Sequence, residues 1–177
     1  FQYGAIAALV VFQPELRAAL ARLGRSRMIR AFQRLEGSRV ADELVEAVER
    51  LARSRVGAII AVEREVGLDE YAETGSSVGA TVSAEMITTI FTPYSPLHDG
   101  AVLISGDTIR TAGAILPLTQ STVRDRSLGT RHRAALGLSE ETDAIVIVVS
   151  EETSQVALAL GGRLERVVGG ERLREIL

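Results

Sequence analysis

Three short runs of uninterrupted apolar residues constrain most strongly what this chain can fold into. They lie at 57–62, 101–104 and 144–149, and the last is the strongest strand pattern in the chain. Because the runs lack the alternation of a half-exposed strand, each predicts a strand buried on both faces. Helical patterns separate them. We therefore expect an α/β fold, a single globular domain with a central mixed β-sheet covered by helices on both faces.

Serine and threonine residues mark the expected helix starts. Ser38 and Ser83 each precede apolar residues at helical spacing, and the helices are expected to end at Arg55 and near Phe91. Thr130 is expected to cap a third helix, and residues 170–177 a short closing one. In the second helix we expect three side chains to face inward, Met86, Ile87 and Ile90.

Turn residues predict how the strands connect. Ser105-Gly106-Asp107 predicts a hairpin between the run at 101–104 and a strand at 108–116. A return strand at 155–160 is expected after 144–149. The remaining stretches are expected to be loops, at 67–82 with a short helical turn and at 119–128.

The first 36 residues differ in pattern from the rest. Residues 1–12 are almost wholly apolar, but a membrane-spanning helix needs roughly 20 such residues. After Pro14 six arginines recur in a helical pattern, as expected just cytoplasmic of a membrane segment or in a solvated amphipathic helix. We expect 1–36 to be the end of a membrane anchor and a juxtamembrane helix, with the anchor's upstream part preceding this sequence. Residues 37–177 then form a cytoplasmic domain at the cell membrane.

Composition excludes several classes of site. The net charge of −3 argues against a general nucleic-acid binder, and the absence of cysteine excludes disulfides and thiolate chemistry. All 20 basic residues are arginine, so there is no P-loop lysine and no Schiff-base lysine. No Gly-x-Gly-x-x-Gly occurs either. A bound nucleotide must be held by arginines, backbone amides and, where present, a metal ion.

The segment Leu97-His98-Asp99-Gly100-Ala101 places a carboxylate at the mouth of an apolar strand. Asp-Gly alone usually marks a turn, but here it precedes a buried strand instead of joining two alternating ones. A carboxylate at a strand end can bind a hard cation or take a proton from a hydroxyl. His98 is either a second metal ligand or a packed or capping residue.

The segment Gly129-Thr130-Arg131-His132-Arg133 loads cations onto the expected start of a helix. Cations are unfavourable there because the helix dipole is positive at its N-terminus, and a bound anion would relieve the conflict. The Thr130 hydroxyl, free amides and two guanidiniums suit phosphate, although a solvated helix start is the alternative. Both histidines of the chain lie in this segment and the preceding one, and together the two segments predict a polyphosphate site.

Ser150-Glu151-Glu152 follows the strongest strand. It is either a hairpin tip or part of a site, because ligands of open sheets collect at strand ends.

These segments resemble the diadenylate cyclase domain family, in its membrane-anchored CdaA type, over nearly the whole chain. Gly57-Ala58-Ile59-Ile60 is similar to the family's GALI stretch, Pro96 to Ala101 to its DGA motif, and Leu128 to Ala135 to its RHR motif. Matches also occur at Ser139-Glu140, at Val149 to Thr153 and at Val10 to Arg17. Three positions depart from the family pattern: Gly79 replaces an aspartate, Ser154 a glycine and Ile115 an aromatic found in some members.

The resemblance implies that two ATP molecules condense to cyclic di-3′,5′-adenylate with release of two pyrophosphates. Each 3′-hydroxyl attacks the α-phosphate of the other nucleotide, so two sites must face each other in a homodimer. It implies Mn²⁺ or Mg²⁺, with metal ligands at His98, Asp99 and Glu152. It also implies a membrane regulator of the YbbR-domain type, phosphoglucosamine mutase as a further partner, and no nucleic acid.

The resemblance also assigns roles to site residues. Asp99 would activate the 3′-hydroxyl, and the catalytic set is Asp99, Arg131, His132 and Arg133. The expected ATP-binding residues are Gly100, Ala101, Leu116, Gly129, Thr130, Arg131, Ser150 and Glu151.

Two other functions compete with this one. His98-Asp99 also occurs in metal phosphohydrolases, but that class embeds the pair in an all-helical domain with several more histidines. A non-catalytic adenine-nucleotide sensor using the same pocket is the other alternative.

Overall fold

The computed structural model describes residues 27–120, 128–167 and 169–177. The chain divides into two units, Phe1–Glu36 and Gly37–Leu177. The segment expected to leave the membrane, and most of the expected loop at 119–128, lie outside the described residues, so the membrane anchor stays a prediction. Within the described ranges no helix has the length and apolar character needed to cross a membrane.

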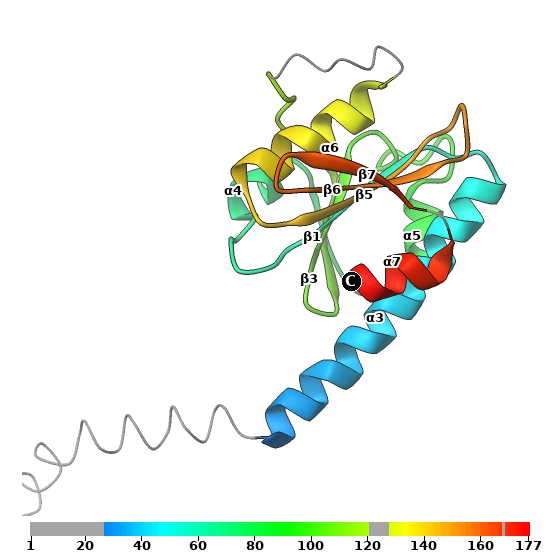
Figure 1. Ribbon diagram of the computed structural model, residues 1–177. Coiled ribbons are helices and arrows are strands. Elements are labelled where there is room, and N and C mark those ends of the chain that lie inside the picture. The colour runs from blue at the N-terminus through cyan, green and yellow to red at the C-terminus, as the bar shows by residue number, and fades with distance from the viewer. Residues whose placement is uncertain (1–26, 121–127, 168) are drawn as a thin grey trace, which may run out of the picture. The chain divides into compact units, whose positions relative to one another are not determined.

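A seven-stranded mixed sheet forms the centre of the second unit (Figure 1). Its strand order is β2-β4-β3-β1-β5-β6-β7. Strand β1 pairs in parallel with β3, and every other neighbouring pair is antiparallel. The strands are β1 (Ala58–Val62), β2 (Ser76–Thr81), β3 (Ala101–Ser105), β4 (Thr108–Ala114), β5 (Ile145–Val149), β6 (Val156–Leu160) and β7 (Arg163–Val167).

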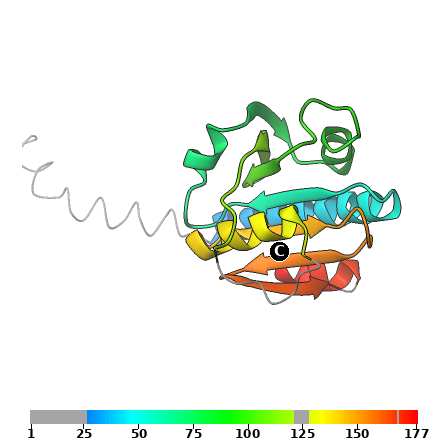
Figure 2. The ribbon, with the colours of Figure 1, turned by 90° about the horizontal axis from the view of Figure 1, so that it is seen from above.

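Helices cover both faces of this sheet. Figures 1 and 2 show α6 on one side of the central strands and α3 on the other. The described helices are α3 (Arg27–Arg53), α4 (Asp69–Ala72), α5 (Ala84–Ile90), α6 (Thr130–Glu141) and α7 (Gly170–Ile176).

Strand β5 shows how the sequence produces these layers, because all five of its residues are buried. Ile145 and Ile147 belong to the core cluster that includes residues of α3, α5 and α7. Val146 and Val148 belong to the second cluster, with residues of α6. Successive side chains of a strand point to opposite faces, so an uninterrupted apolar run fills two cores at once. The predicted α/β fold with a mixed sheet covered on both faces is confirmed.

Most of the expected elements are present. The three apolar runs form β1, β3 and β5, and the hairpin of β3 with β4 and the return strand β6 are in place. The Ser83 hydroxyl accepts a hydrogen bond from the amide of Met86 at 3.2 Å, so the predicted cap of α5 is confirmed. The closing helix is α7.

Three local predictions were wrong. Helix α3 runs through Ser38, because good helix formers precede that position and the single glycine at 37 costs only about 1 kcal/mol. Gly129 is the N-cap residue of α6, and Thr130 is its first helical residue. Met86 is 37% exposed, whereas Ile87 and Ile90 are buried.

Strands β2 and β7 were not predicted, β2 lying within the expected loop at 67–82. Both are edge strands of the sheet. Most residues of β2 are exposed. In β7 the charged residues are exposed, and the two apolar residues are partly buried. Edge strands carry little apolar pattern, because pairing with the neighbouring strand forms them more than burial does.

Polar contacts fix α4 beside the core. The Tyr71 hydroxyl donates a hydrogen bond to Glu141 at the end of α6, at 2.6 Å, which raises the pKa of Tyr71 to about 12. Arg110 on β4 pairs with Asp69 at 2.6 Å and with Glu63 at 3.3 Å. These contacts tie α4 to both α6 and the sheet.

Tyr94 lies on the loop between α5 and β3 in a strained conformation. Its φ of 77° is in the left-handed region, and its side chain is 98% exposed. An L-residue other than Asn or Gly costs roughly 1–2 kcal/mol in that region, and an exposed side chain returns little by packing.

We therefore expect Tyr94→Asn to stabilise the protein by about 1 kcal/mol, because asparagine tolerates this backbone conformation. Thermal unfolding should show a rise in Tm of roughly 2–4 °C. Tyr94→Phe, which keeps the same backbone restriction, is the control and should leave Tm unchanged. A lower Tm for Tyr94→Asn would show that the tyrosine side chain stabilises the fold.

Candidate functional site

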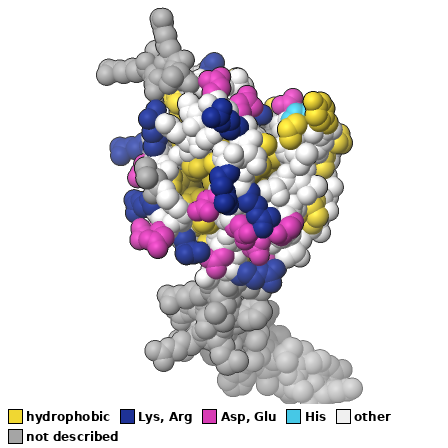
Figure 3. Space-filling model, turned by 90° about the vertical axis from the view of Figure 1, so that its right-hand side faces the viewer, with side chains coloured by type: hydrophobic (Ala, Val, Ile, Leu, Met, Phe, Trp, Pro, Cys, Tyr) yellow, Lys and Arg dark blue, Asp and Glu magenta, His cyan; other side chains and the backbone are white. Residues whose placement is uncertain are grey.

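A cavity of about 810 Å³ opens at one edge of the sheet, within the size range of small-molecule sites. The start of β3, the segment after β4, the start of α6 and the β5–β6 turn surround it. Figure 3 shows this face, with hydrophobic side chains at its centre and arginine and acidic side chains around them. The lining residues are Ile59, Asp99, Gly100, Ala101, Ala114, Ile115, Leu116, Leu118, Leu128, Gly129, Thr130, Arg131, His132, Ala134, Val149, Ser150, Glu151, Glu152, Thr153, Gln155, Ala157, Leu164 and Arg166.

The cavity brings together most of the predicted site residues from four separate segments of the sequence. They are Asp99, Gly100, Ala101, Leu116, Gly129, Thr130, Arg131, His132, Ser150, Glu151 and Glu152.

Two predicted residues do not line the cavity. His98 is half-buried, and its Nδ1 lies 2.5 Å from the carbonyl oxygen of Ser95 within the same loop. Arg133 is exposed on α6, and its carbonyl oxygen accepts a hydrogen bond from the Thr119 amide at 3.0 Å. The geometry gives His98 a loop-stabilising contact and places Arg133 on the outer side of the helix start.

A close backbone contact fixes where Asp99 lies. Gly100 has φ +122° and Gly113 on β4 has φ +70°. A Cβ atom at Gly100 would lie 2.6 Å from the carbonyl carbon of Gly113, so the two strands approach at a distance that only glycine permits. The ladder between β3 and β4 shifts register at the same place, between Ala101 and Leu103. Asp99 is thereby held, exposed, at the cavity mouth.

The Asp99 carboxylate is available for a ligand. This carboxylate forms no hydrogen bond or ion pair with any of the residues that the structure describes. It differs in this respect from Glu63, which accepts hydrogen bonds from the Leu68 amide and the Ser105 hydroxyl.

Another close contact places α6 against the segment after β4. A Cβ atom at Gly137 would collide with the carbonyl of Pro117 and lie 2.8 Å from the Thr119 amide nitrogen. The helix therefore packs directly on the segment that follows β4, which also carries Leu116. This contact holds the helix close to residues 115–118, which form one wall of the cavity.

An ion pair crosses the cavity wall at the helix start. Arg131 Nη1 lies 3.0 Å from Glu151 Oε2, and the two side chains are 29% and 56% exposed. Arginines at a helix N-terminus face the positive end of its dipole, and in this structure Glu151 supplies the compensating anion. A partly exposed pair of this kind contributes at most about 1 kcal/mol, so a polyphosphate can compete for Arg131.

The carboxylates of the cavity fit a phosphate-bridged cation better than a metal site made of protein alone. Among described residues, His, Asp and Glu side chains form no group of three or more that could hold a metal ion. Asp99, Glu151 and Glu152 nevertheless line one cavity. Mg²⁺ and Mn²⁺ prefer oxygen ligands and are commonly bound through one or two carboxylates together with substrate phosphates.

Arg166 and Leu164 also line the cavity and were missed in the sequence. Both lie on β7, whose weak apolar pattern hid it. In the sequence, Leu164 and Val167 stand among charged residues, which is only a weak strand signal.

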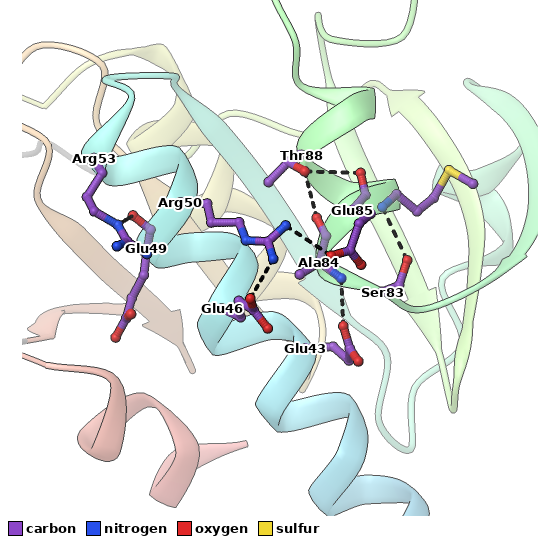
Figure 4. A network of polar contacts seen from close by, with 10 residues as sticks. Glu43, Glu46, Glu49, Arg50, Arg53, Ser83, Ala84, Glu85 and Thr88 are labelled. Carbon is purple, nitrogen blue, oxygen red and sulfur yellow. Dashed lines mark hydrogen bonds and ion pairs between the residues drawn. The ribbon is translucent and has the colours of Figure 1, made fainter.

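A smaller cavity of about 500 Å³ lies between α3 and α5 and carries no comparable chemistry. Its Arg50 is already paired with Glu46 at 2.5 Å and Glu85 at 3.1 Å, as Figure 4 shows. In the same network Glu43 accepts the Ala84 amide, and Thr88 donates to the Ala84 carbonyl. The contacts of Arg50 with Glu85 and of Glu43 with the Ala84 amide join the two helices, so we assign this cavity to the helix junction.

Comparisons with known proteins agree with the motifs that meet in the large cavity. The family model DAC, described as DisA bacterial checkpoint controller nucleotide-binding, matches residues 45–164. A Listeria monocytogenes protein named diadenylate cyclase is 47% identical over 99% of this chain and 65% of its own length. Cyclic di-AMP synthase CdaA of Bacillus subtilis is 43% identical over the same shares, 99% and 65%.

A solved structure is similar as well. The crystal structure of a double mutant of DacA from Staphylococcus aureus has a TM-score of 0.76 and 42% identity, covering 78% of this chain and 93% of that one. The chain spans 65% of the length of the two curated relatives.

The position of Arg131 yields a test of the phosphate site. We expect Arg131→Ala to weaken the binding of ATP by about tenfold or more, because charge-assisted bonds to phosphate are lost. Adenosine should bind as it does to the unaltered protein, since no contact to the base changes. Calorimetry with both ligands measures this. Arg133→Ala, outside the cavity lining, should have the smaller effect, and equal loss for ATP and adenosine would point to a collapsed helix start instead.

Proposed function

The chain belongs to the diadenylate cyclase domain family, and on this premise we propose that it condenses two ATP molecules into cyclic di-3′,5′-adenylate. Two pyrophosphates are released. The observation that carries the proposal is the single cavity in which the Asp99 loop, the α6 start and the β5–β6 turn meet. Polyphosphate binding and proton abstraction need these groups side by side.

The reaction repeats one step twice. The 3′-hydroxyl oxygen of one nucleotide forms a bond to the α-phosphorus of the other, and the bond from that phosphorus to the bridging oxygen of pyrophosphate breaks. Asp99 takes the hydroxyl proton. Like Glu152, it lines the cavity and has no other partner among the described residues. We assign the base to Asp99 because it directly precedes Gly100, whose close contact with Gly113 fixes the backbone there.

The remaining lining residues bind and orient the nucleotide. Arg131, the Thr130 hydroxyl and the free amides of the α6 start hold the phosphates and stabilise charge that develops during transfer. Ser150 contributes from the β5–β6 turn. On the opposite wall, Ile115 and Leu118 are 71% and 46% exposed, so apolar surface is available to the adenine. Leu116 meets the adenine edge through its backbone.

A divalent cation, Mn²⁺ or Mg²⁺, completes the proposed site. Asp99 and Glu152 would hold it together with substrate phosphates, and His98 belongs to its surroundings. When bound, the cation neutralises charge on the phosphates. Arg131 would orient the same phosphates from the start of α6.

Assembly and location follow from the same premise. The described residues bring Asp99, Arg131 and Ser150 together in one cavity, so in this proposal each chain binds one ATP, and closing two phosphodiester bonds requires two chains whose cavities face each other. We propose a face-to-face homodimer, held at the cytoplasmic side of the membrane by an anchor that includes residues 1–36. A YbbR-domain regulator and phosphoglucosamine mutase are the proposed partners.

A non-catalytic nucleotide sensor is the second candidate. The one observation that favours it is that Arg131 already pairs with Glu151. A metal phosphohydrolase is disfavoured, because the chain has two histidines and only His132 lines the cavity.

The role of Asp99 is tested by Asp99→Asn. This substitution keeps the size of the side chain and its capacity for hydrogen bonding, but it removes the negative charge that lets the carboxylate accept a proton. Product formation from ATP and Mn²⁺, followed by mass spectrometry, should fall by about 10²-fold or more. Calorimetry should show ATP still bound, and the exposed position predicts an unchanged Tm. Product within about twofold of the unaltered protein would exclude Asp99 as a positioned base.

The two-chain mechanism predicts that specific activity depends on protein concentration. Below the dimer dissociation constant, activity per chain should fall on dilution, because chemistry needs both chains. A tandem fusion of two copies should resist this loss, since tethering raises the effective concentration to about the millimolar range. Sedimentation over the same range reports the dimer. Flat specific activity where sedimentation shows monomers would contradict the mechanism.

A further inference from the structure

Gly57 lies directly before β1, and the space beside it is occupied by the ion pair of the site. A Cβ atom at this position would lie 2.6 Å from Arg131 Nη1, 2.9 Å from Arg131 Cζ and 2.9 Å from Glu151 Oε2. Real Cβ atoms essentially never approach other heavy atoms so closely. Any side chain at 57 must therefore displace the guanidinium or the carboxylate.

The backbone itself does not require glycine at this position. The φ of Gly57 lies outside the left-handed region, unlike those of Gly100 and Gly113. Residue 57 is buried, and it precedes a strand whose residues are ordinary in conformation. Glycine is needed at this position because it has no side chain, and not because of its conformational freedom.

We propose that Gly57 is a positioning residue, whose lack of a side chain determines where the Arg131 guanidinium lies. The inference rests on the proposed function, in which Arg131 binds phosphate. Arg131 comes from α6 and Glu151 from the β5–β6 turn, so neither element alone fixes the pair. Gly57 gives both side chains a common surface on the central strand of the sheet.

The register of β1 supports this location. Residues 57 and 59 share one face of an extended chain, and Ile59 lines the large cavity. Because β1 pairs with both β3 and β5, its start is held from two sides. Phosphoryl transfer depends mostly on positioning, and a shift of about 1 Å in a positioning group can cost about 10²-fold in rate.

Gly57 differs from three other crowded glycines of the fold, and among the glycines with such close side-chain neighbours only Gly57 meets residues that line the large cavity, since Gly170 meets Val45 and Glu49. A Cβ atom at Gly75, Gly100 or Gly137 would meet backbone atoms, so substitution there disturbs strand or helix packing. At Gly57 the close atoms are the ends of two flexible side chains, which can move at little cost in stability. A substitution at residue 57 should therefore displace the Arg131 side chain without unfolding the protein.

The experiment compares Gly57→Ala with Gly37→Ala, an exposed position where a Cβ atom meets nothing within 4 Å. Gly57→Ala should keep its Tm within about 2–4 °C, which corresponds to about 1 kcal/mol or less. ATP affinity should fall by about tenfold, the value of a lost charge-assisted contact, while adenosine affinity stays unchanged. Gly37→Ala should leave both affinities unchanged. Wild-type ATP affinity in Gly57→Ala would overturn the proposal.

A double-mutant cycle shows whether Gly57 acts through Arg131. In an Arg131→Ala background, Gly57→Ala should cause no further loss of ATP affinity, because the displaced group is gone. If the double variant instead loses ATP affinity by the product of the two single-variant factors, the proposal is overturned. The ¹⁵N-edited NMR resonance of Arg131 Nε–H should shift in Gly57→Ala without any nucleotide, and an unmoved resonance would also overturn it. This readout is independent of catalysis, so failure to form cyclic dinucleotide would count against the proposed function alone.

Discussion

Burial of both faces of β1, β3 and β5 is the constraint on which the rest of the structure depends. Their side chains alternate between two core clusters, one with α3, α5 and α7 and one with α6. A sheet buried in this way needs a helix layer on each side. The parallel pairing of β1 with β3 and the antiparallel pairing of β1 with β5 bring the start of β3 and the end of β5 to the same edge. The cavity lies at that edge because the core topology leaves these ends together.

Close backbone contacts then turn this edge into a site of defined geometry. The approach of Gly100 to Gly113 fixes the aspartate loop, and the approach of Gly137 to Pro117 holds α6 against the segment that follows β4. Gly57 differs in kind, because it meets the ends of the Arg131 and Glu151 side chains and not backbone. Glycine therefore has three roles around one cavity. It permits close strand packing at Gly100, close helix packing at Gly137, and placement of the Arg131 guanidinium at Gly57.

The sequence predicted the layered fold and most of the candidate residues that the structure brings to one cavity, because both depend on strong local patterns. Uninterrupted apolar runs locate central strands, and the Asp99 and Arg131 segments carry their chemistry in a few adjacent residues. The edge strands β2 and β7 could not be predicted in the same way, since pairing and not burial forms them, and Arg166 was missed with β7. The pairing of Arg131 with Glu151, and the contact of both with Gly57, depends on tertiary placement of three distant segments. No spacing rule along the chain encodes such a contact.

The most direct test of the central claim, that two nucleotides are joined at this cavity, follows the atoms of ATP into the product. The protein is incubated with Mn²⁺ and an equal mixture of unlabelled and uniformly ¹⁵N-labelled ATP, and the products are analysed by mass spectrometry. The account predicts cyclic dinucleotide in unlabelled, half-labelled and fully labelled forms, with the half-labelled form most abundant, together with pyrophosphate. Recovery of intact ATP from protein that binds it, or release of mononucleotide without cyclic dinucleotide, would contradict the account.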